Sequence, residues 1–336
     1  MRVLTVLFVG IWRKAQHMKK KNVNNSVAVR KVPLSARIYK YRWFYLMFLP
    51  VLIFGILFYY MPMLGVLLSF TKYNGIKDPT FVGMDNFERM FSMPKFWEAF
   101  WNTLELSIIK LLLNTGMAVI LSLLLNEIIN LKLKKLAQTI IYLPHFMSWV
   151  VTASVWGMIL SPTSEGLVNT FLISIGVLEK GSEIYFLGSV KWWRFAYYVI
   201  NIWKDTGWGT IIFMATLSGI NPELYEAAAI DGAGRWKKMR YVTFPALLNT
   251  IITVLILNLA KVMNLFESVF VLQNDAVVST AQVLQTYIYA QTFNGSGIPN
   301  YGYSTAVGLF RSLVGCALVL VCNYLSKKVR EGRGIV

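Results

Sequence analysis

The chain has 336 residues, of which 56% are hydrophobic and 15% are charged, and its mean hydropathy is +0.53. This composition excludes an ordinary soluble globular protein. The formal net charge of +17 would also suit a nucleic-acid partner, but the cations gather beside apolar runs and no RNA-binding or zinc-finger pattern occurs, so we expect contact with membrane lipid and none with nucleic acid.

Residues 1–42 carry eleven Lys and Arg and form the first expected element, a basic cytoplasmic tail. The apolar run at residues 4–12 is too short to cross a bilayer. A basic cluster follows it where a signal peptide would carry a cleavage site, so we do not expect a signal peptide.

Six apolar runs of about twenty residues follow, each with the length of a membrane-crossing helix. The sequence therefore predicts an all-α membrane protein with six transmembrane helices, at residues 43–70, 100–125, 136–160, 195–217, 246–272 and 303–325. We divide the chain into the N-terminal tail (1–42), the first helix with its outer loop (43–99), a five-helix core (100–325) and a basic C-terminal tail (326–336).

Lys and Arg accumulate on one side of the predicted membrane. Cationic segments precede the first span and follow the second, fourth and sixth spans, whereas acidic residues offset the cations in the other segments. Cations mark the cytoplasmic side, so both termini are expected in the cytoplasm. The outer segments at 71–99, 161–194 and 273–302 are long enough to fold against an external partner.

Cysteine and histidine give no sign of a disulfide or a metal centre. Cys316 and Cys322 lie in one apolar run and point in different directions. His17 and His145 have no cysteine or carboxylate cluster near them in the sequence, and we expect a solvated tail residue and a membrane-interface residue. We therefore expect neither a metal site nor a catalytic residue.

The most informative segment is the loop between the fourth and fifth predicted spans, at residues 221–245. Asn221 can cap a short helix, Pro222 suits its first position, and Gly232 can take the left-handed conformation that ends it. Three alanines in this helix give a smooth surface that another protein can approach closely. Such a helix between two apolar spans is useful when another protein docks on it.

This segment resembles the EAA loop of ABC importer permeases, which has Glu-Ala-Ala, three residues, Gly, nine residues and then Ile-x-Leu-Pro. Here residues 242–245 are Val-Thr-Phe-Pro, with two conservative departures from that ending. The resemblance implies a coupling helix that contacts an ATPase. Its motif residues are Glu226, Ala227, Ala228, Asp231, Gly232 and Pro245.

Further segments resemble the carbohydrate branch of binding-protein-dependent permeases, specifically the polysaccharide-type, LplB-like members. These segments are residues 60–65, 82–87, 121–127, 142–149 and 303–310, and the resemblance runs from about residue 42 to residue 330. It implies the type I importer (MetI-like) permease fold in a bacterial cytoplasmic membrane, with the last five helices as the common core. The implied function is alternating-access import of oligosaccharides.

The resemblance also implies partners: a second, homologous permease subunit, two ATPase subunits and an extracytoplasmic solute-binding protein. The sequence independently lacks a P-loop, whose Gly-rich turn and Lys hold phosphates. We therefore expect the partner ATPase to use ATP and Mg, this chain to bind no cofactor, and the chain not to be an enzyme.

Polar groups inside apolar spans are costly and suggest either a cavity or a buried pair. In the fifth predicted span they recur every third residue and would spiral around a continuous helix, so they are not expected to line one pore together. The candidates for a substrate path are Lys204, Asp205, Asn258, Lys261, Asn264, Glu267 and Arg311.

Buried interhelical ion pairs are the alternative to a substrate path, and the sequence leaves both open. In that account Glu105, Asp205 and Glu267 neutralise the cations Lys204, Lys261 and Arg311. If these cations instead face a wet cavity, they favour an anionic, uronate-containing oligosaccharide.

Another class of function is a membrane-embedded polysaccharide synthase or transferase. Such an enzyme needs carboxylates gathered on a cytoplasmic face to hold a metal and a nucleotide sugar. The predicted inner segments hold only five, three of them in the EAA segment: Glu127, Glu223, Glu226, Asp231 and Glu331. A channel or a secondary transporter would leave the EAA segment unexplained.

Overall fold

The computed structural model describes residues 34–163, 165–294 and 299–329. The chain divides into two compact units, Met1–Leu64 and Gly65–Val336. Most of the predicted basic N-terminal tail and the part of the C-terminal tail beyond residue 329 therefore lie outside the described residues.

The first unit contains α2 (Leu34–Lys40), α3 (Arg42–Gly55), a π-helical turn (Ile56–Tyr60) and α4 (Met61–Met63). A 3-10 segment, Leu64–Phe70, continues the helical path, so that Arg42–Phe70 forms 29 helical residues and contains an 18-residue window with a mean hydropathy of 2.3. No residue of α3 is buried, and a helix that is apolar all around suits lipid. The first predicted span is confirmed as a helix long enough to cross a membrane.

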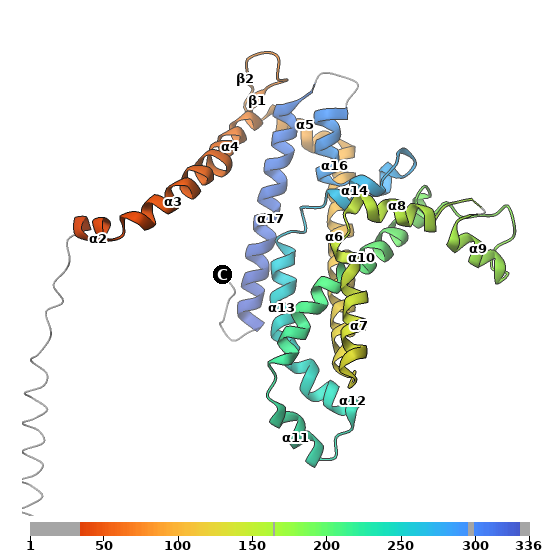
Figure 1. Ribbon diagram of the computed structural model, residues 1–336. Coiled ribbons are helices and arrows are strands. Elements are labelled where there is room, and N and C mark those ends of the chain that lie inside the picture. The colour runs from red at the N-terminus through yellow and green to blue at the C-terminus, as the bar shows by residue number, and fades with distance from the viewer. Residues whose placement is uncertain (1–33, 164, 295–298, 330–336) are drawn as a thin grey trace, which may run out of the picture. The chain divides into compact units, whose positions relative to one another are not determined.

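The second unit is built of helices, with one short antiparallel ladder between β1 (Thr71–Lys72) and β2 (Thr80–Phe81) as a small departure from the all-α prediction (Figure 1). The helices in chain order are α5 (Asp85–Ser92), α6 (Pro94–Asn126), α7 (Leu131–Tyr142), α8 (Trp149–Ile159), α9 (Leu167–Ser174), α10 (Val190–Ser218), α11 (Pro222–Ile230), α12 (Arg235–Lys238), α13 (Phe244–Leu259), α14 (Glu267–Leu272), α15 (Val278–Ala281), α16 (Leu284–Tyr289) and α17 (Tyr301–Val329). Single turns of 3-10 helix lie at Leu143–Phe146 and Asp275–Val277, and π-helical turns lie at Met239–Thr243 and Ala290–Asn294.

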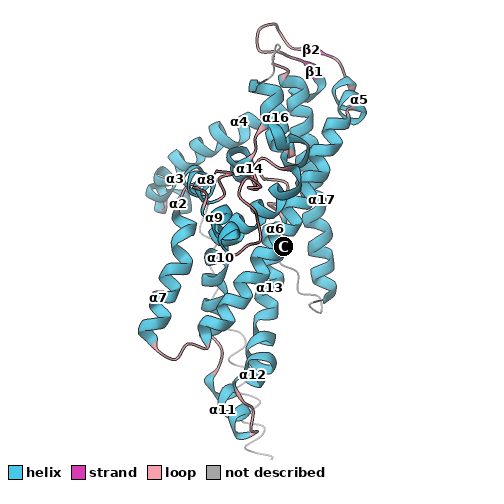
Figure 2. Cartoon of the chain, turned by 90° about the vertical axis from the view of Figure 1, so that its right-hand side faces the viewer, coloured by secondary structure: helices cyan, strands magenta, loops and turns pink. Residues whose placement is uncertain are grey.

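Helices α6 and α10 pack along one another and α13 packs against both, while α17 packs on α13 and α5. Buried apolar side chains of α10, including Trp193 and Tyr197, lie in one core cluster with Leu106 of α6. The indole nitrogen of Trp193 donates a hydrogen bond to the carbonyl of Leu272 at 2.9 Å. A second cluster joins Ala118 of α6 to Phe213 of α10. Figure 2 shows α11 and α12 together at one end of the molecule, below α13.

The third predicted span, 136–160, is wrong as a single helix. Helix α7 ends at Tyr142, the 3-10 turn Leu143–Phe146 follows, and α8 begins at Trp149. Pro144 has no backbone N–H, so the hydrogen bond that residue 144 would donate to the Ile140 carbonyl is absent and α7 ends. The hydroxyl of Ser148 then accepts a hydrogen bond from the Val151 amide at 3.2 Å and caps α8.

The fifth predicted span, 246–272, is also interrupted. Helix α13 ends at Leu259, a non-helical turn follows, and α14 begins only at Glu267. Among the described residues, four helices are long and apolar enough to cross a membrane: Arg42–Phe70, Pro94–Asn126, Arg235–Leu259 and Tyr301–Tyr324. Six spans would also require α10, which is 29 residues long and contains Lys204 and Asp205, and the interrupted segment of α7 and α8. The number of six transmembrane spans therefore stays a prediction.

Candidate functional site

The loop between α10 and α13 forms a capped, exposed helix, as the sequence predicts. The side-chain oxygen of Asn221 accepts a hydrogen bond from the Glu223 amide at 3.1 Å, and Pro222 is the first residue of α11. None of the residues of α11 is buried. Figure 1 shows α11 beyond the ends of α10 and α13, where another protein can reach it.

Helix α11 ends in a Schellman motif. Gly232 has a φ of +74°, which is the left-handed conformation that glycine adopts without strain. The Gly232 amide donates to the carbonyl of Ala229 at 3.0 Å, and the Ala233 amide donates to the carbonyl of Ala228 at 2.9 Å. These two bonds satisfy carbonyls that the end of a helix leaves without partners.

The six motif residues do not share one environment. Glu226, Ala227, Asp231 and Gly232 are exposed and Ala228 is half-buried, all in or beside α11. Pro245 is also exposed, but it lies in the first turn of α13.

Two side-chain contacts connect this loop to the long helices. The Tyr225 hydroxyl of α11 lies 3.1 Å from the Thr243 hydroxyl, immediately before α13. Arg235 of α12 forms an ion pair with Glu127 at the end of α6, with 2.9 Å between Nε and Oε2. No local sequence pattern indicates these pairs, because their partners are 18 and 108 residues apart.

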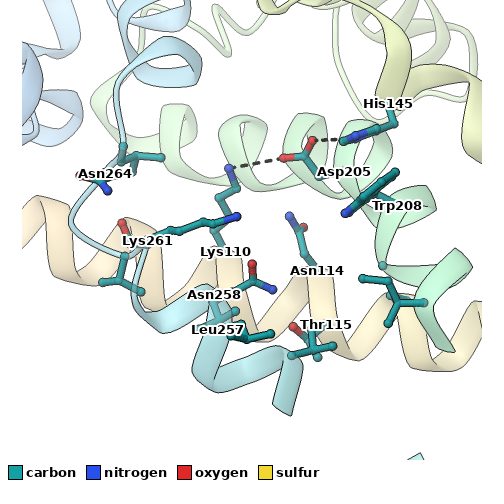
Figure 3. Close-up of a pocket in the computed structure, with 18 of the residues that line it drawn as sticks. Lys110, Asn114, Thr115, His145, Asp205, Trp208, Leu257, Asn258, Lys261 and Asn264 are labelled. Atoms are coloured by element: carbon teal, nitrogen blue, oxygen red, sulfur yellow. Dashed lines mark ion pairs between the residues drawn. The ribbon is translucent and has the colours of Figure 1, made fainter. Parts of the chain in front are cut away.

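The second candidate site is a cavity of about 540 Å³ between α6, α10, α13 and the turn after α13 (Figure 3). Its apolar wall comes from residues such as Leu111 and Phe213. Its polar and charged lining is Ser107, Lys110, Asn114, Thr115, His145, Asp205, Asn258, Lys261 and Asn264. A mostly apolar hollow with a few converging polar groups is typical of a ligand site.

Asp205 lies between two basic side chains of this lining. Its Oδ2 is 3.4 Å from Nζ of Lys110 on α6, and its Oδ1 is 3.6 Å from Nδ1 of His145. The side chains of Lys110 and Asp205 keep 22% and 24% exposure, so the pair faces the cavity. The ring of His145 stacks on Trp208 at a centroid distance of 5.2 Å and an interplanar angle of 18°.

Lys204 is buried behind this cavity and is not part of its lining. Its Nζ donates a hydrogen bond to the carbonyl of His145 at 3.2 Å and lies 5.2 Å from the ring centroid of Trp149. The carbonyl becomes available because the 3-10 turn interrupts the hydrogen-bond pattern between α7 and α8.

The turn after α13 brings together residues that a continuous helix would separate. The Lys261 amide donates to the Asn258 carbonyl at 2.9 Å, and the Asn264 amide donates to the Lys261 carbonyl at 2.8 Å. All three side chains line the cavity, whereas Glu267 is exposed at the start of α14 and does not. The expectation of a spiral is wrong here because the helix ends at Leu259.

Arg311 of α17 lines a second cavity of about 370 Å³, and Asn264 lines both cavities. Nε and Nη1 of Arg311 are buried without a hydrogen-bond partner. Among the described residues, none of the cations Lys204, Lys261 and Arg311 forms an ion pair.

The alternative of interhelical ion pairs holds for Asp205 and Glu105, but their partners are not the three candidate cations. Asp205 pairs with Lys110, and Glu105 pairs with Arg194 instead of a candidate cation. Arg194 also donates to the side-chain oxygen of Asn102 at 2.8 Å.

Sequence reasoning did not assign His145 or Trp208 to a site. His145 follows Leu-Pro inside an apolar run, which is the signal of the interrupted helix that brings it to the cavity. On α6, the polar residues Ser107, Lys110 and Asn114 recur at steps of three and four, which places them on one helix face.

Comparisons with known proteins agree with the arrangement of the second unit. Residues 115–331 match a family model described as "Binding-protein-dependent transport system inner membrane component". Protein LplB of Bacillus subtilis (strain 168) is 38% identical over 314 residues, which cover 92% of this chain and 96% of that protein. The polygalacturonan/rhamnogalacturonan transport system permease protein YteP of the same organism is 38% identical over 302 residues, 89% of this chain and 92% of that one.

A solved structure shows the same fold. One chain of a crystal structure of a bacterial alginate ABC transporter, in complex with an alginate pentasaccharide-bound periplasmic protein, is 35% identical to this chain, with a TM-score of 0.80. The alignment covers 90% of this chain and 99% of that one. This chain is accordingly a permease and not itself an enzyme, and it belongs to the family of inner membrane components of binding-protein-dependent transport systems.

Proposed function

We propose that this protein is the membrane-spanning subunit of an ATP-driven importer that moves oligosaccharides through the cavity between α6, α10 and α13. One observation carries the proposal. The helices that line the cavity include α6 and α13, and the loop with the exposed, capped helix α11 contacts the end of α6 and the start of α13. A solute that enters the cavity and an ATPase that binds α11 would thus act on the same helices. A synthase has no comparable use for an exposed coupling helix.

The partners follow from this function. Helix α11 offers one docking surface, so a transporter with two ATPase subunits needs a second, homologous permease. A solute-binding protein would deliver the sugar to the outer segments, and both termini of this chain would lie in the cytoplasm. The ATP and Mg would be used by the ATPase subunits.

The charges of the cavity favour an acidic oligosaccharide. Lys110 and Lys261 line it with Asp205 as the single carboxylate, and Lys204 adds a buried cation behind it. Lysines at membrane depth are costly unless they have a partner or water, and a uronate group would supply a partner. YteP is named for the transport of polygalacturonan and rhamnogalacturonan, and a similar bacterial ABC transporter imports the acidic polysaccharide alginate.

The test is uptake by the complete complex in proteoliposomes. We expect ATP-dependent uptake of a uronate tetrasaccharide, tetragalacturonate or tetramannuronate, and much weaker uptake of its methyl ester, which has the same length without charge. Lys261→Met should lower uptake of the acid about tenfold, the effect of one charge-assisted contact. Lys132→Met, which changes an exposed lysine at the start of α7 and outside the cavity, is the matched control.

Uptake of no oligosaccharide would refute the function. If the acid and its ester were taken up equally and Lys261→Met had no effect, the conclusion that the protein imports oligosaccharides would stand, and the proposed preference for acidic ones would be refuted.

A further inference from the structure

Two successive residues of α10 contact the turn that separates α7 from α8, here named the α7–α8 turn (Leu143–Phe146). Lys204 donates to the His145 carbonyl at 3.2 Å, and the carboxylate of Asp205 lies 3.6 Å from Nδ1 of His145. His145 is the third residue of the turn. His145 therefore connects the turn to α10 twice, through its backbone carbonyl and through its ring.

Asp205 lies too far from both of its basic neighbours to form a short, strong hydrogen bond with either of them. Charge-assisted N–H···O bonds in proteins are about 2.7–2.9 Å long, whereas Asp205 is 3.4 Å from Lys110 and 3.6 Å from His145. Nδ1 of His145 is buried and has no hydrogen-bond partner. A small rotation of the carboxylate toward the ring would complete a hydrogen bond that is missing now (Figure 3).

Lys110 is the neighbour that a solute can reach. Its side chain lines the cavity and stays partly exposed. A sugar carboxylate that binds Lys110 would compete with Asp205 for the same ammonium group. A neutral sugar offers only hydroxyls, which are weaker acceptors than a carboxylate, so it would leave the pair of Lys110 and Asp205 in place.

We propose that His145 is a positioning residue for acidic substrates: it receives the carboxylate of Asp205 when a substrate carboxylate takes Lys110. The exchange leaves no buried charge without a partner, because Asp205 gains the Nδ1–H···O bond as it loses Lys110. It also tightens the contact between α10 and the α7–α8 turn. The stacking of His145 on Trp208 keeps the ring plane fixed during the exchange. This inference rests on the proposed import of acidic oligosaccharides.

The direct test is ¹⁵N NMR of histidine in the assembled complex, with label in this chain, which contains two histidines. The His145 signal is assigned by its loss in His145→Asn. We expect tetragalacturonate or tetramannuronate, whichever is taken up, to shift the Nδ1 resonance toward a hydrogen-bonded value. Its methyl ester should leave the resonance unchanged. Lys110→Met should produce the shifted resonance without any sugar, because Asp205 then has only His145 as a partner.

Variants of the turn add a functional readout. His145→Leu removes the donor and should lower uptake of the acidic tetramer about tenfold. His145→Asn places an amide nitrogen near the position of Nδ1 and should restore uptake to within about threefold of the wild type. Leu143→Met changes an exposed side chain of the same turn and is the control for a general disturbance.

An unchanged His145 resonance with an acidic tetramer that the complex does take up would overturn the inference and leave the proposed function standing. So would equal uptake by the His145→Leu and His145→Asn variants. Failure of uptake for every oligosaccharide would instead count against the proposed function.

Discussion

Replacing Gly232 by alanine should loosen the end of α11 by an amount that the backbone alone determines. Gly232 has a φ of +74°, and a Cβ added there meets no heavy atom within 4 Å. The penalty is therefore the left-handed conformation itself, roughly 1–2 kcal/mol for a residue with a Cβ. This corresponds to a change of about 5- to 30-fold in the equilibrium between the capped and uncapped ends.

A series of substitutions separates this cause from others. Asparagine tolerates the left-handed region, so Gly232→Asn should have the smallest effect, followed by Gly232→Ala and then the β-branched Gly232→Val. Gly234→Ala is the matched control, because Gly234 has a φ of −67° and open space around its Cβ position. Gly234 is the N-cap residue of α12, so any cost of Gly234→Ala falls on α12, and hydrogen exchange in α11 should not change.

The measurements are amide hydrogen exchange of α11 and ATP-coupled uptake by the reconstituted complex. Exchange in α11 should accelerate about 5- to 30-fold in Gly232→Ala, in proportion to local opening, and uptake should fall in the same order as the series. Membrane insertion should not change. Equal effects of Gly232→Ala and Gly234→Ala, or unaltered exchange in Gly232→Val, would refute the reasoning.

Other variants test the remaining contacts. Glu226→Lys, which reverses an exposed charge on α11, should lower stimulation of the ATPase by this subunit; unchanged stimulation would remove Glu226 from the docking surface. Tyr225→Phe should lose the hydroxyl contact with Thr243 and destabilise the position of α11 by about 1 kcal/mol, seen as faster exchange in α11; an unchanged rate would contradict this. Arg311→Gln should reduce the preference for an acidic tetramer over its methyl ester, and unaltered selectivity would place Arg311 outside the substrate path. The purified chain alone should show no ATPase activity, and activity in a preparation free of other chains would overturn the partner assignment.

The exposed loop could be predicted from the sequence because the residues that determine its structure are close together in the chain. The cap at Asn221, the proline after it and the glycine at the end all act within one short segment, and the structure has each of them as predicted. Apolar length was likewise enough to locate α6 and α17, whose observed bounds differ from the predicted ones by a few residues.

The cavity was harder to predict because interruptions of helices create it. Apolar composition does not distinguish a continuous span from two short helices, so the turn at Pro144 and the turn after Leu259 were not anticipated. Those turns bring His145 and Lys261 to the cavity. The pairing of Asp205 with Lys110 depends on how α6 and α10 face each other, which the periodicity of either helix alone does not contain.

Helix α6 runs without a break from the segment at Ser279–Gln282, past the cavity, to Arg235 of α12. At 1.5 Å per residue its 33 residues span about 50 Å, well beyond the roughly 30 Å of a hydrocarbon core. Near one end, Asn102 donates to the carbonyls of Ser279 and Gln282 at 3.0 and 3.1 Å, and at the other end Glu127 pairs with Arg235.

Lys110 and Glu127 are separated by about 26 Å along this axis. A tilt of about 10° centred on Lys110 would therefore swing the Glu127 end by about 4–5 Å, close to the pitch of one helical turn. An unbroken helix of this length acts as a lever, in which a small reorientation beside a bound sugar becomes a displacement large enough to move the α11–α12 loop relative to a docked protein.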